Sequence, residues 1–257
     1  MPRLCPRSLL IALLSLTLLA GAGAPAIAQD ATPAPGGVTI LGPDESYAGV
    51  TRGEWTARWA QWALSFPAEI NPNFDPTGAQ CGYGQSGPVF FLPGAFMPEP
   101  YDRTCVVPEG AAIFVSLNGA ECSTVEPPPF FGRNEAELAA CAEAFTDESS
   151  DLQASINGEA VPGLEAYQVG SPLFALTFAE DNIFDVPAGV GLAVANSYSF
   201  IIAPPPPGEY EITLTADFTA VGGEVLTGTT RVIVEAPQVI EPAATPGASP
   251  EAATPVA

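Results

Sequence analysis

The side chains that could do chemistry in this chain are carboxylates, hydroxyls and cysteines, because the sequence contains no His and no Lys. Imidazole bases, His metal ligands, Ser-His-Asp triads and Cys-His dyads are therefore excluded, and so is a Ser-Lys pair. Paired carboxylates remain, since they cleave glycosidic bonds when they lie about 5 Å or about 6.5–9.5 Å apart. Glu54, beside Trp55, and Glu121, beside Cys122, are nominal candidates, although Glu54 also has a helix-capping role. Because the chain contains 29 acidic residues, the sequence does not single out one pair of carboxylates, and we assign no catalytic residue.

A cluster of oxygen ligands is the second candidate. Glu180, Asp181, Asn182 and Asp185 lie close together in the sequence, and Ca²⁺ binds carboxylate and amide oxygens in extracellular proteins. Their order does not match an EF-hand loop, which needs ligands at alternate positions and a distant Glu. The spacing therefore favours a solvated turn between two strands. We expect no cofactor, with a calcium site at this cluster as the alternative.

All three Trp residues fall in one short segment. Trp55, Trp59, Trp62 and Phe66 follow each other at helical spacing, and on a helix they occupy a stripe about 60° wide. Such a stripe usually packs a helix onto a sheet, and this is the interpretation we favour. The alternative is an exposed aromatic platform of Trp55, Trp59 and Trp62 that stacks on sugars.

Charge limits the possible partners. The chain has 7 basic and 29 acidic side chains, which gives a formal net charge of −22. A surface this acidic opposes binding to the phosphates of nucleic acids or to an anionic membrane. An extracellular glycan or an envelope component stays possible as a partner, and the sequence leaves the oligomeric state open.

The ends of the chain have compositions of their own. Residues 1–28 resemble a secretory signal, with Arg3 and Arg7 before an apolar core that is too short to span a membrane, and with a small-residue cleavage site at Ala28. Residues 29–44 are expected to form a flexible leader, residues 45–235 one domain, and residues 236–257 a disordered Pro/Ala/Thr-rich tail. We therefore expect a secreted protein.

Four cysteines follow the signal, and an even number in an exported chain predicts disulfides. Their spacings include no Cys-x-x-Cys pair, which argues against a metal site. Of the three possible pairings we favour Cys81–Cys105 with Cys122–Cys141, because both close short loops; each closure stabilises by about 3 kcal/mol.

The elements that must position these residues are mostly strands. Six segments rich in Val, Ile, Phe, Tyr and Thr predict strands at residues 88–92, 111–117, 173–178, 197–203, 210–219 and 224–235. Gly222-Gly223 is expected to join the last two of them. Two helices are predicted, one from Thr51 to before Pro67 and one from Asn134 to about Phe145, because a Glu follows each cap residue after three positions.

Several stretches, listed here, resemble a group of uncharacterised secreted bacterial proteins: GEWTARWAQW (53–62), GQSGPVFFL (84–92), RTCVVPEG (103–110), SPLFALTFAEDNIF (171–184) and PGEY (207–210). The similarity covers about residues 45–235. It implies no activity, cofactor or catalytic residue. Pro-Gly-x-Tyr before an alternating strand is also typical of immunoglobulin-like sandwiches in exported proteins.

The sequence thus predicts a mainly β, disulfide-bonded domain, built as an antiparallel β-sandwich of immunoglobulin-like or jelly-roll-like form, with two short α-helices. The function that fits best is a secreted, non-enzymatic binding or envelope-associated module. The alternatives are a carbohydrate-active enzyme that uses paired carboxylates and a purely structural envelope protein.

Overall fold

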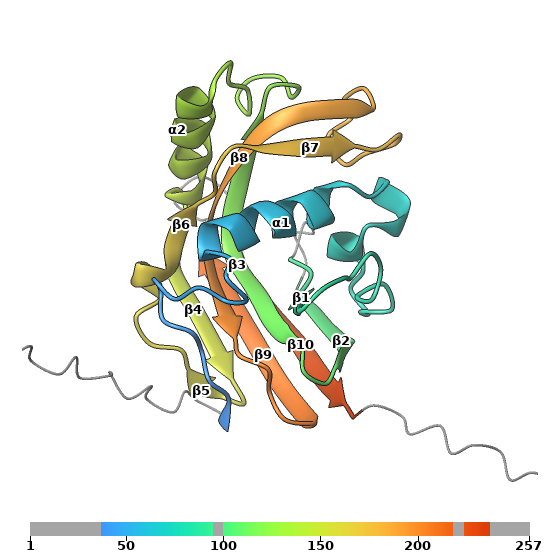
Figure 1. Cartoon of the computed structure of the whole chain (residues 1–257), viewed down its shortest axis with the longest axis vertical. Coiled ribbons are helices and arrows are strands. Elements are labelled where there is room, and N and C mark those ends of the chain that lie inside the picture. Colours follow the sequence, from blue (N-terminus) through green and yellow to red (C-terminus); the bar gives the residue numbers. More distant parts are fainter. Residues whose placement is uncertain (1–36, 95–99, 218–223, 237–257) are drawn as a thin grey trace, which may run out of the picture. The chain divides into compact units, whose positions relative to one another are not determined.

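The computed structural model describes residues 37–94, 100–217 and 224–236, which form two β-sheets and two α-helices (Figure 1). The first sheet has the order β1-β3-β8, and β6 and β7 both pair with the other edge of β8. Its strands are β1 (Val89–Phe91), β3 (Ala112–Ser123), β6 (Gln168–Gly170), β7 (Phe174–Phe178) and β8 (Gly189–Ile202).

The second sheet has the order β2-β10-β9-β4-β5. Its strands are β2 (Tyr101–Pro108), β4 (Ser150–Ile156), β5 (Glu159–Ala160), β9 (Gly208–Asp217) and β10 (Val225–Glu235). The helices are α1 (Arg52–Leu64) and α2 (Glu135–Thr146), and three single turns of 3-10 helix complete the described chain: η2 (Ala68–Ile70), η3 (Pro72–Phe74) and η4 (Leu164–Tyr167). A mainly β chain with two α-helices is therefore confirmed.

The expectation of wholly antiparallel sheets is wrong, because each sheet contains one parallel pair. β1 pairs in parallel with β3, and β10 pairs in parallel with β2. In each pair other elements lie between the two strands along the chain, and the periodicity of a strand reports which of its faces is buried, not which strand is its neighbour. The immunoglobulin-like or jelly-roll-like form stays a prediction.

The described residues form three apolar clusters; one joins α2 to the first sheet, and the two larger ones hold the layers together. The first lies between the sheets and joins side chains such as Phe90, Val115 and Phe200 of the first sheet to Ile156 and Val232 of the second. The second lies on the opposite face of the first sheet, under α1; Trp55, Trp62, Phe91, Phe114 and Ile201 belong to it. The first sheet is therefore covered on both faces, by the second sheet and by α1.

Both helices begin where their caps predict. The Thr51 hydroxyl accepts a hydrogen bond from the Glu54 amide while the Glu54 carboxylate accepts one from the Thr51 amide, which is a complete capping box. Asn134 caps α2 by accepting from the Glu137 amide at 3.0 Å. Local chemistry thus fixes where α1 starts, and α1 forms one wall of the site described below.

The part of the expected flexible leader that the structure describes is ordered instead. Val38 is 4% exposed, and the Leu41 amide donates to the Ile201 carbonyl at 2.9 Å, so residues 38–41 lie along β8. The apolar Val-Thr-Ile-Leu segment buries enough surface to order its backbone, which the composition of the whole leader concealed. The expected signal, the tail after residue 236 and Gly222-Gly223 lie outside the described residues.

Two cations, Arg52 and Arg103, are buried in the described part of the chain, and their hydrogen bonds go to backbone carbonyls. Arg103 on β2 is fully buried, with its guanidinium 3.8 Å from the centre of the Tyr101 ring and donating to the Gly94 carbonyl at 3.1 Å. Gly228 of β10 leaves room for the Tyr101 ring, since a Cβ there would lie 2.0 Å from it. Burial lowers the pKa of Arg103. None of the described helices is long and apolar enough to cross a membrane.

Candidate ligand pocket

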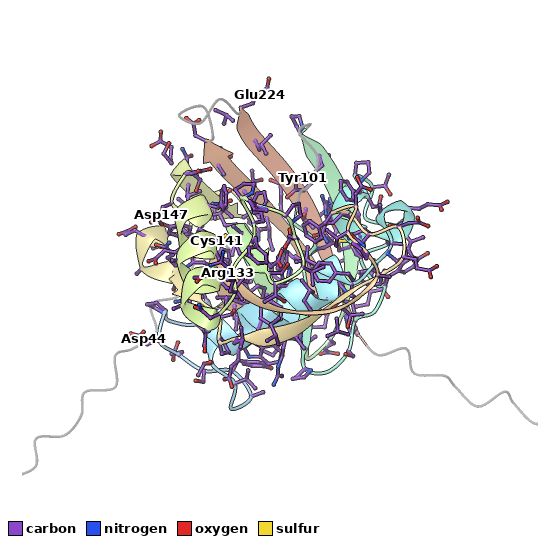
Figure 2. The ribbon with its side chains drawn as sticks, turned by 90° about the horizontal axis from the view of Figure 1, so that it is seen from above. Asp44, Tyr101, Arg133, Cys141, Asp147 and Glu224 are labelled. Carbon is purple, nitrogen blue, oxygen red and sulfur yellow. A yellow bond between two sulfur atoms is a disulfide. The ribbon has the colours of Figure 1, made fainter. Side chains whose placement is uncertain are left out.

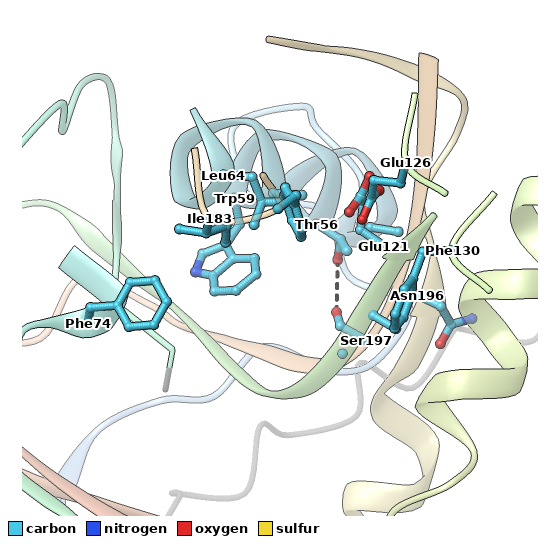
Figure 3. A pocket seen from close by; sticks show the side chains of 15 residues that line it. Thr56, Trp59, Leu64, Phe74, Glu121, Glu126, Phe130, Ile183, Asn196 and Ser197 are labelled. Atoms are coloured by element: carbon cyan, nitrogen blue, oxygen red, sulfur yellow. Dashed lines mark hydrogen bonds between the residues drawn. The ribbon is translucent and has the colours of Figure 1, made fainter. Parts of the chain in front are cut away.

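A pocket of about 330 Å³ lies between α1 and the face of the first sheet that α1 covers (Figure 3). We call it the Glu121 pocket. Its lining comes from α1, from β3 and β8, and from the segments around Glu126 and Ile183. A volume of this size falls within the range of small-molecule sites, which are mostly apolar with a few placed polar groups.

The pocket exists because β3 and β8 carry small residues there. On the pocket side, Gly119 pairs with Ser197 and Glu121 pairs with Ala195. A Cβ at Gly119 would lie 2.7 Å from the Ser197 Cβ and 2.8 Å from the Asn196 carbonyl oxygen, so only glycine fits. The register of β3 shifts between Ser116 and Asn118, and this bulge re-aims the side chains that follow it.

Strand alternation sends Glu121 into the pocket, because its neighbour Cys122 faces the other side of the sheet. Cys122 packs there with Leu138 and Ala142 of α2 and forms a disulfide with Cys141. Figure 2 shows Cys141 on that helix. The covalent link therefore fixes the strand immediately beside the acidic side chain.

A turn after β3 brings a second carboxylate to the same place. The Ser123 hydroxyl accepts from the Glu126 amide at 3.1 Å and donates to the Glu126 Oε2 at 2.8 Å. This turn returns the Glu126 side chain to the pocket, where it is 4% exposed. Figure 3 shows the Glu121 and Glu126 carboxyl groups together at one end of the site.

The two carboxyl groups lie within hydrogen-bonding reach of each other, and such a contact needs a shared proton. Burial, followed by the charge of Glu126, raises the pKa of Glu121 well above its usual range. Burial also raises the pKa of Glu126, although its hydrogen bonds with Glu121 and Ser123 act in the opposite direction. The Oε1 atom of Glu121 is buried and has no hydrogen-bond partner. The two carboxyl groups are therefore harder to ionise together than two separate ones would be.

The opposite end of the pocket is apolar. Trp59 lines it with a half-buried indole whose Nε1 donates to the Leu92 carbonyl at 2.9 Å, which fixes the ring. Phe130 lines the acidic end, and its ring stacks on Phe145 of α2 at a centroid distance of 4.4 Å. Aromatic walls held from behind in this way favour a flat or apolar ligand body.

A row of hydroxyl groups closes the floor beside α1. The Thr56 hydroxyl lies 3.4 Å from those of Ser197 and Ser199, which are 3.1 Å from each other. Thr56 also donates to the Arg52 carbonyl one turn earlier, at 3.1 Å. These hydroxyls lie within hydrogen-bonding distance of one another, whereas Oε1 of Glu121 has no partner.

The structure separates the three Trp residues of the predicted stripe. Trp55 is 3% exposed and Trp62 is 7% exposed, and both pack against Phe91 of the first sheet. Their Nε1 groups donate to the carbonyls of Tyr47 and Tyr83, respectively. Of the three, Trp59 is the one that reaches the pocket, so an aromatic contact with a ligand would use a single ring.

The oxygen-rich cluster of residues 180–185, for which the sequence favours a turn over a calcium site, forms a turn in which Asn182 organises the backbone. Asn182 is 4% exposed; its amide donates to the Ala179 and Val186 carbonyls, and its carbonyl oxygen accepts from the Phe184 amide. Asp181 and Asp185 adopt left-handed backbone conformations, with φ of 54° at both. Within the described ranges, no three Asp, Glu or Cys side chains come together as a metal group.

Glu54 and Glu121, the nominal carboxylate candidates, do not meet in one site. Glu54 is exposed at the start of α1, where its hydrogen bonds with Thr51 lower its pKa. Glu121 instead meets Glu126, which the sequence reasoning missed. Period-two alternation from Cys122 would have placed Glu121 on the opposite face of the strand, which α1 covers. No local sequence pattern predicts the turn that brings Glu126 back to Glu121.

The disulfides join Cys81 to Cys105 and Cys122 to Cys141, the pairing that the short loops favoured. They indicate an oxidising compartment. The Cys81–Cys105 bond lies in the cluster between the two sheets, away from the pocket face.

Comparisons with known proteins add little. No family model matches the chain, and no curated protein matches it. One solved structure, described as "Structure of PbICP-C in complex with falcipain-2", is similar over 58% of this chain and 100% of that chain, at 12% identity and a TM-score of 0.23. A score that low supports no conclusion about fold or activity.

Proposed function

We propose that this chain is a secreted, non-enzymatic module that binds a small molecule in the Glu121 pocket. The observation that carries the proposal is the pocket of about 330 Å³ with apolar walls and one buried carboxyl pair. An apolar cavity with a few convergent polar groups and shifted pKa values is the usual form of a small-molecule site. Export to the cell exterior or the envelope fits the two disulfides and the signal-like start of the sequence.

Binding is favoured over glycoside hydrolysis by the contact between Glu121 and Glu126. Glycosidases hold their two carboxyl groups at about 5–5.5 Å or about 6.5–9.5 Å, which leaves room for the scissile bond or for a water molecule. Carboxyl groups that share a proton directly leave neither space. Hydrolysis remains the second candidate because a proton-sharing acid pair beside an aromatic wall is also a plausible acid–base device.

Ligand-observed NMR with a set of small fluorinated aromatic fragments tests the proposal on the full chain. The fragments that bind should lose affinity in the Ala195→Leu variant, which fills the pocket between Glu121 and α1. The matched control is Ala175→Leu, an exposed position on β7 of the same sheet. Ser197→Val provides a second filling variant if Ala195→Leu does not fold.

Two results would overturn the proposal. Fragments that bind all the variants equally would place binding elsewhere, and an absence of binding would favour a purely structural role. Release of reducing sugar from a polysaccharide panel, abolished by Glu121→Gln, would establish the enzymatic alternative instead.

A further inference from the structure

The described cavities and buried charges differ in what they offer a ligand. A wide polar groove runs beside Arg52, but its guanidinium already donates to the carbonyls of Pro43, Tyr167 and Ser199. The guanidinium of Arg103 has unused donors, yet none of the described pockets includes it. The Glu121 pocket is where a cavity and an unsatisfied buried polar atom coincide.

We propose that the Glu121 pocket selects a small organic ammonium ion, whose N–H groups donate to the Glu121–Glu126 pair while its aromatic or alkyl body lies against Trp59. This inference rests on the proposed function and names the ligand class of the same site. The geometry behind it is an acidic end and an apolar end within one cavity.

The charges around the cavity favour a cation. Among the lining residues, Glu121 and Glu126 are the only titratable or charged ones; α1, β8 and the segment at Ile183 contribute none. The charged side chains of α1 are engaged elsewhere: Arg52 donates to backbone carbonyls, Glu54 binds Thr51, and Arg58 lies over the Trp55 ring at 4.6 Å. With a chain charge of −22 adding to the local field, an anion would be repelled.

The hydrogen-bonding inventory favours a ligand rich in donors. An ionised carboxylate only accepts, and an ammonium group only donates, so the two are matched. The Glu121 Oε1 has no partner, while the Glu126 Oε2 already accepts from Ser123 and is held in place by it. A ligand alcohol could satisfy one acceptor, but an ammonium group can satisfy several and compensates the negative charge as well.

The apolar end matches the body of such a ligand. Trp59 and Ile183 line it, and a Trp face also attracts a cation that lies over it. Pocket walls of this kind bury the carbon skeleton while the charged end reaches the carboxylates.

Binding of the ammonium should displace the shared proton. In the free protein, burial raises the pKa of both carboxyl groups, so the pair keeps its last proton to a higher pH than separate carboxyl groups would. A bound cation favours the fully ionised pair, and affinity should therefore rise with pH through the titration of the pair and vanish when both groups are protonated. Calorimetry in buffers of different ionisation enthalpy would detect the released proton.

Three phenyl compounds of similar size separate the possibilities: phenethylamine, 2-phenylethanol and 3-phenylpropionate. Their affinities are measured on the full chain at neutral pH by calorimetry. We expect phenethylamine to bind about tenfold or more tightly than 2-phenylethanol, since charge-assisted hydrogen bonds are about twice as strong as neutral ones. 3-Phenylpropionate should show no binding.

Variants of the acid pair test whether Glu121 and Glu126 cause the preference for the amine over the alcohol. Glu121→Gln should remove most of the preference for the amine over the alcohol, with Glu126→Gln as a second variant if the first does not fold. Glu209→Gln changes the net charge equally at an exposed position on β9 and should change neither affinity.

The outcomes separate the two proposals. Equal binding of amine and alcohol would overturn the ammonium preference and leave small-molecule binding standing. Amine binding that survives both Glu121→Gln and Ala195→Leu would be attraction to the acidic surface, which also overturns the inference. Failure of all three compounds and of the fluorinated fragments would overturn the proposed function itself.

Discussion

Under α1, strands β3 and β8 present two different surfaces on the two sides of the β3 bulge. Before the bulge, Phe114 pairs with Ile201, and the large side chains close the space beneath the helix. After it, Gly119 and Glu121 of β3 lie opposite small residues of β8, and the space stays open as a pocket. We call these surfaces the packed half and the open half.

The difference shows how one sheet face can serve two purposes. Both halves use the same pair of strands and the same covering helix, so the backbone does not decide between a core and a cavity. Side-chain volume decides it, together with the polar residues that the open half retains. The packed half supplies the stability that allows a buried acid pair to exist a few residues away.

The largest expected effect comes from opening the packed half. Phe114 is fully buried, with its ring 5.9 Å from that of Phe91 and 6.5 Å from that of Trp59. Phe114→Ala should lower the free energy of unfolding by about 3–5 kcal/mol, as large cavities in cores do. Urea denaturation measures the change, with Phe131→Ala as a control at a 39% exposed position. A loss of about 1 kcal/mol or less for Phe114→Ala would contradict the packed half as described.

The next effect tests what holds the open half in place. Replacing Cys122 and Cys141 together by Ala should cost about 2–4 kcal/mol of stability, because the closed loop is lost from the unfolded state. The matched control replaces Cys81 and Cys105, whose loop of 24 residues resembles the one of 19. Both variants should lose similar stability in thermal unfolding.

Ligand binding should separate these two variants. Loss of Cys122–Cys141 frees the strand beside Glu121, so affinity for phenethylamine should fall, whereas loss of Cys81–Cys105 should leave it unchanged. Equal affinities in the two variants would show that the open half does not depend on its disulfide.

Much of the fold followed from local signals in the sequence. Thr51 and Asn134 start the two helices where their caps predicted, and the cysteine spacing favoured the observed pairing. The two parallel pairs, β1 with β3 and β2 with β10, did not follow from the sequence, because tertiary packing decides which strands become neighbours. β2 was missed as a strand: its inward face carries Arg103, which hides the apolar alternation.

The site was less predictable than the fold for a related reason. Glu121 stood out only by its position next to Cys122, and its partner lies five residues later beyond a turn. That turn depends on the Ser123 hydroxyl, which contacts both the amide and the carboxylate of Glu126. A cavity forms where facing side chains are too small to fill the space between two elements, and no sequence motif identifies those small residues.

A smaller effect on stability is expected when the ionisable Glu121 of the open half is replaced by a neutral side chain. The raised pKa of Glu121 means that the folded state binds more protons than the unfolded state, so stability falls as pH rises from about 4.3 through the raised pKa. Glu121→Gln removes that loss and lets the amide donate to Glu126. The variant should match the parent in acid and be more stable than the parent at neutral pH, because the Gln side chain stays neutral over the whole range.

Denaturation at a series of pH values measures this difference. Glu209→Gln, which removes an exposed charge on β9, should keep the pH dependence of the parent protein. If Glu121→Gln is less stable than the parent at neutral pH, then Glu121 is ionised and satisfied in the folded protein, and the acid pair is not as we describe it.

The smallest effect lies at the boundary between the halves, where the Thr56, Ser197 and Ser199 hydroxyls meet. Ser199→Ala and Thr56→Val should each cost about 0.5–1.5 kcal/mol, the usual net contribution of a hydrogen bond. Because their mutual distance of 3.4 Å is at the limit for a hydrogen bond, a double-mutant cycle should give a coupling below about 1 kcal/mol. A larger coupling would mean that the hydroxyl row clamps α1 to the sheet. The open half would then owe its shape to hydrogen bonds as much as to small side chains.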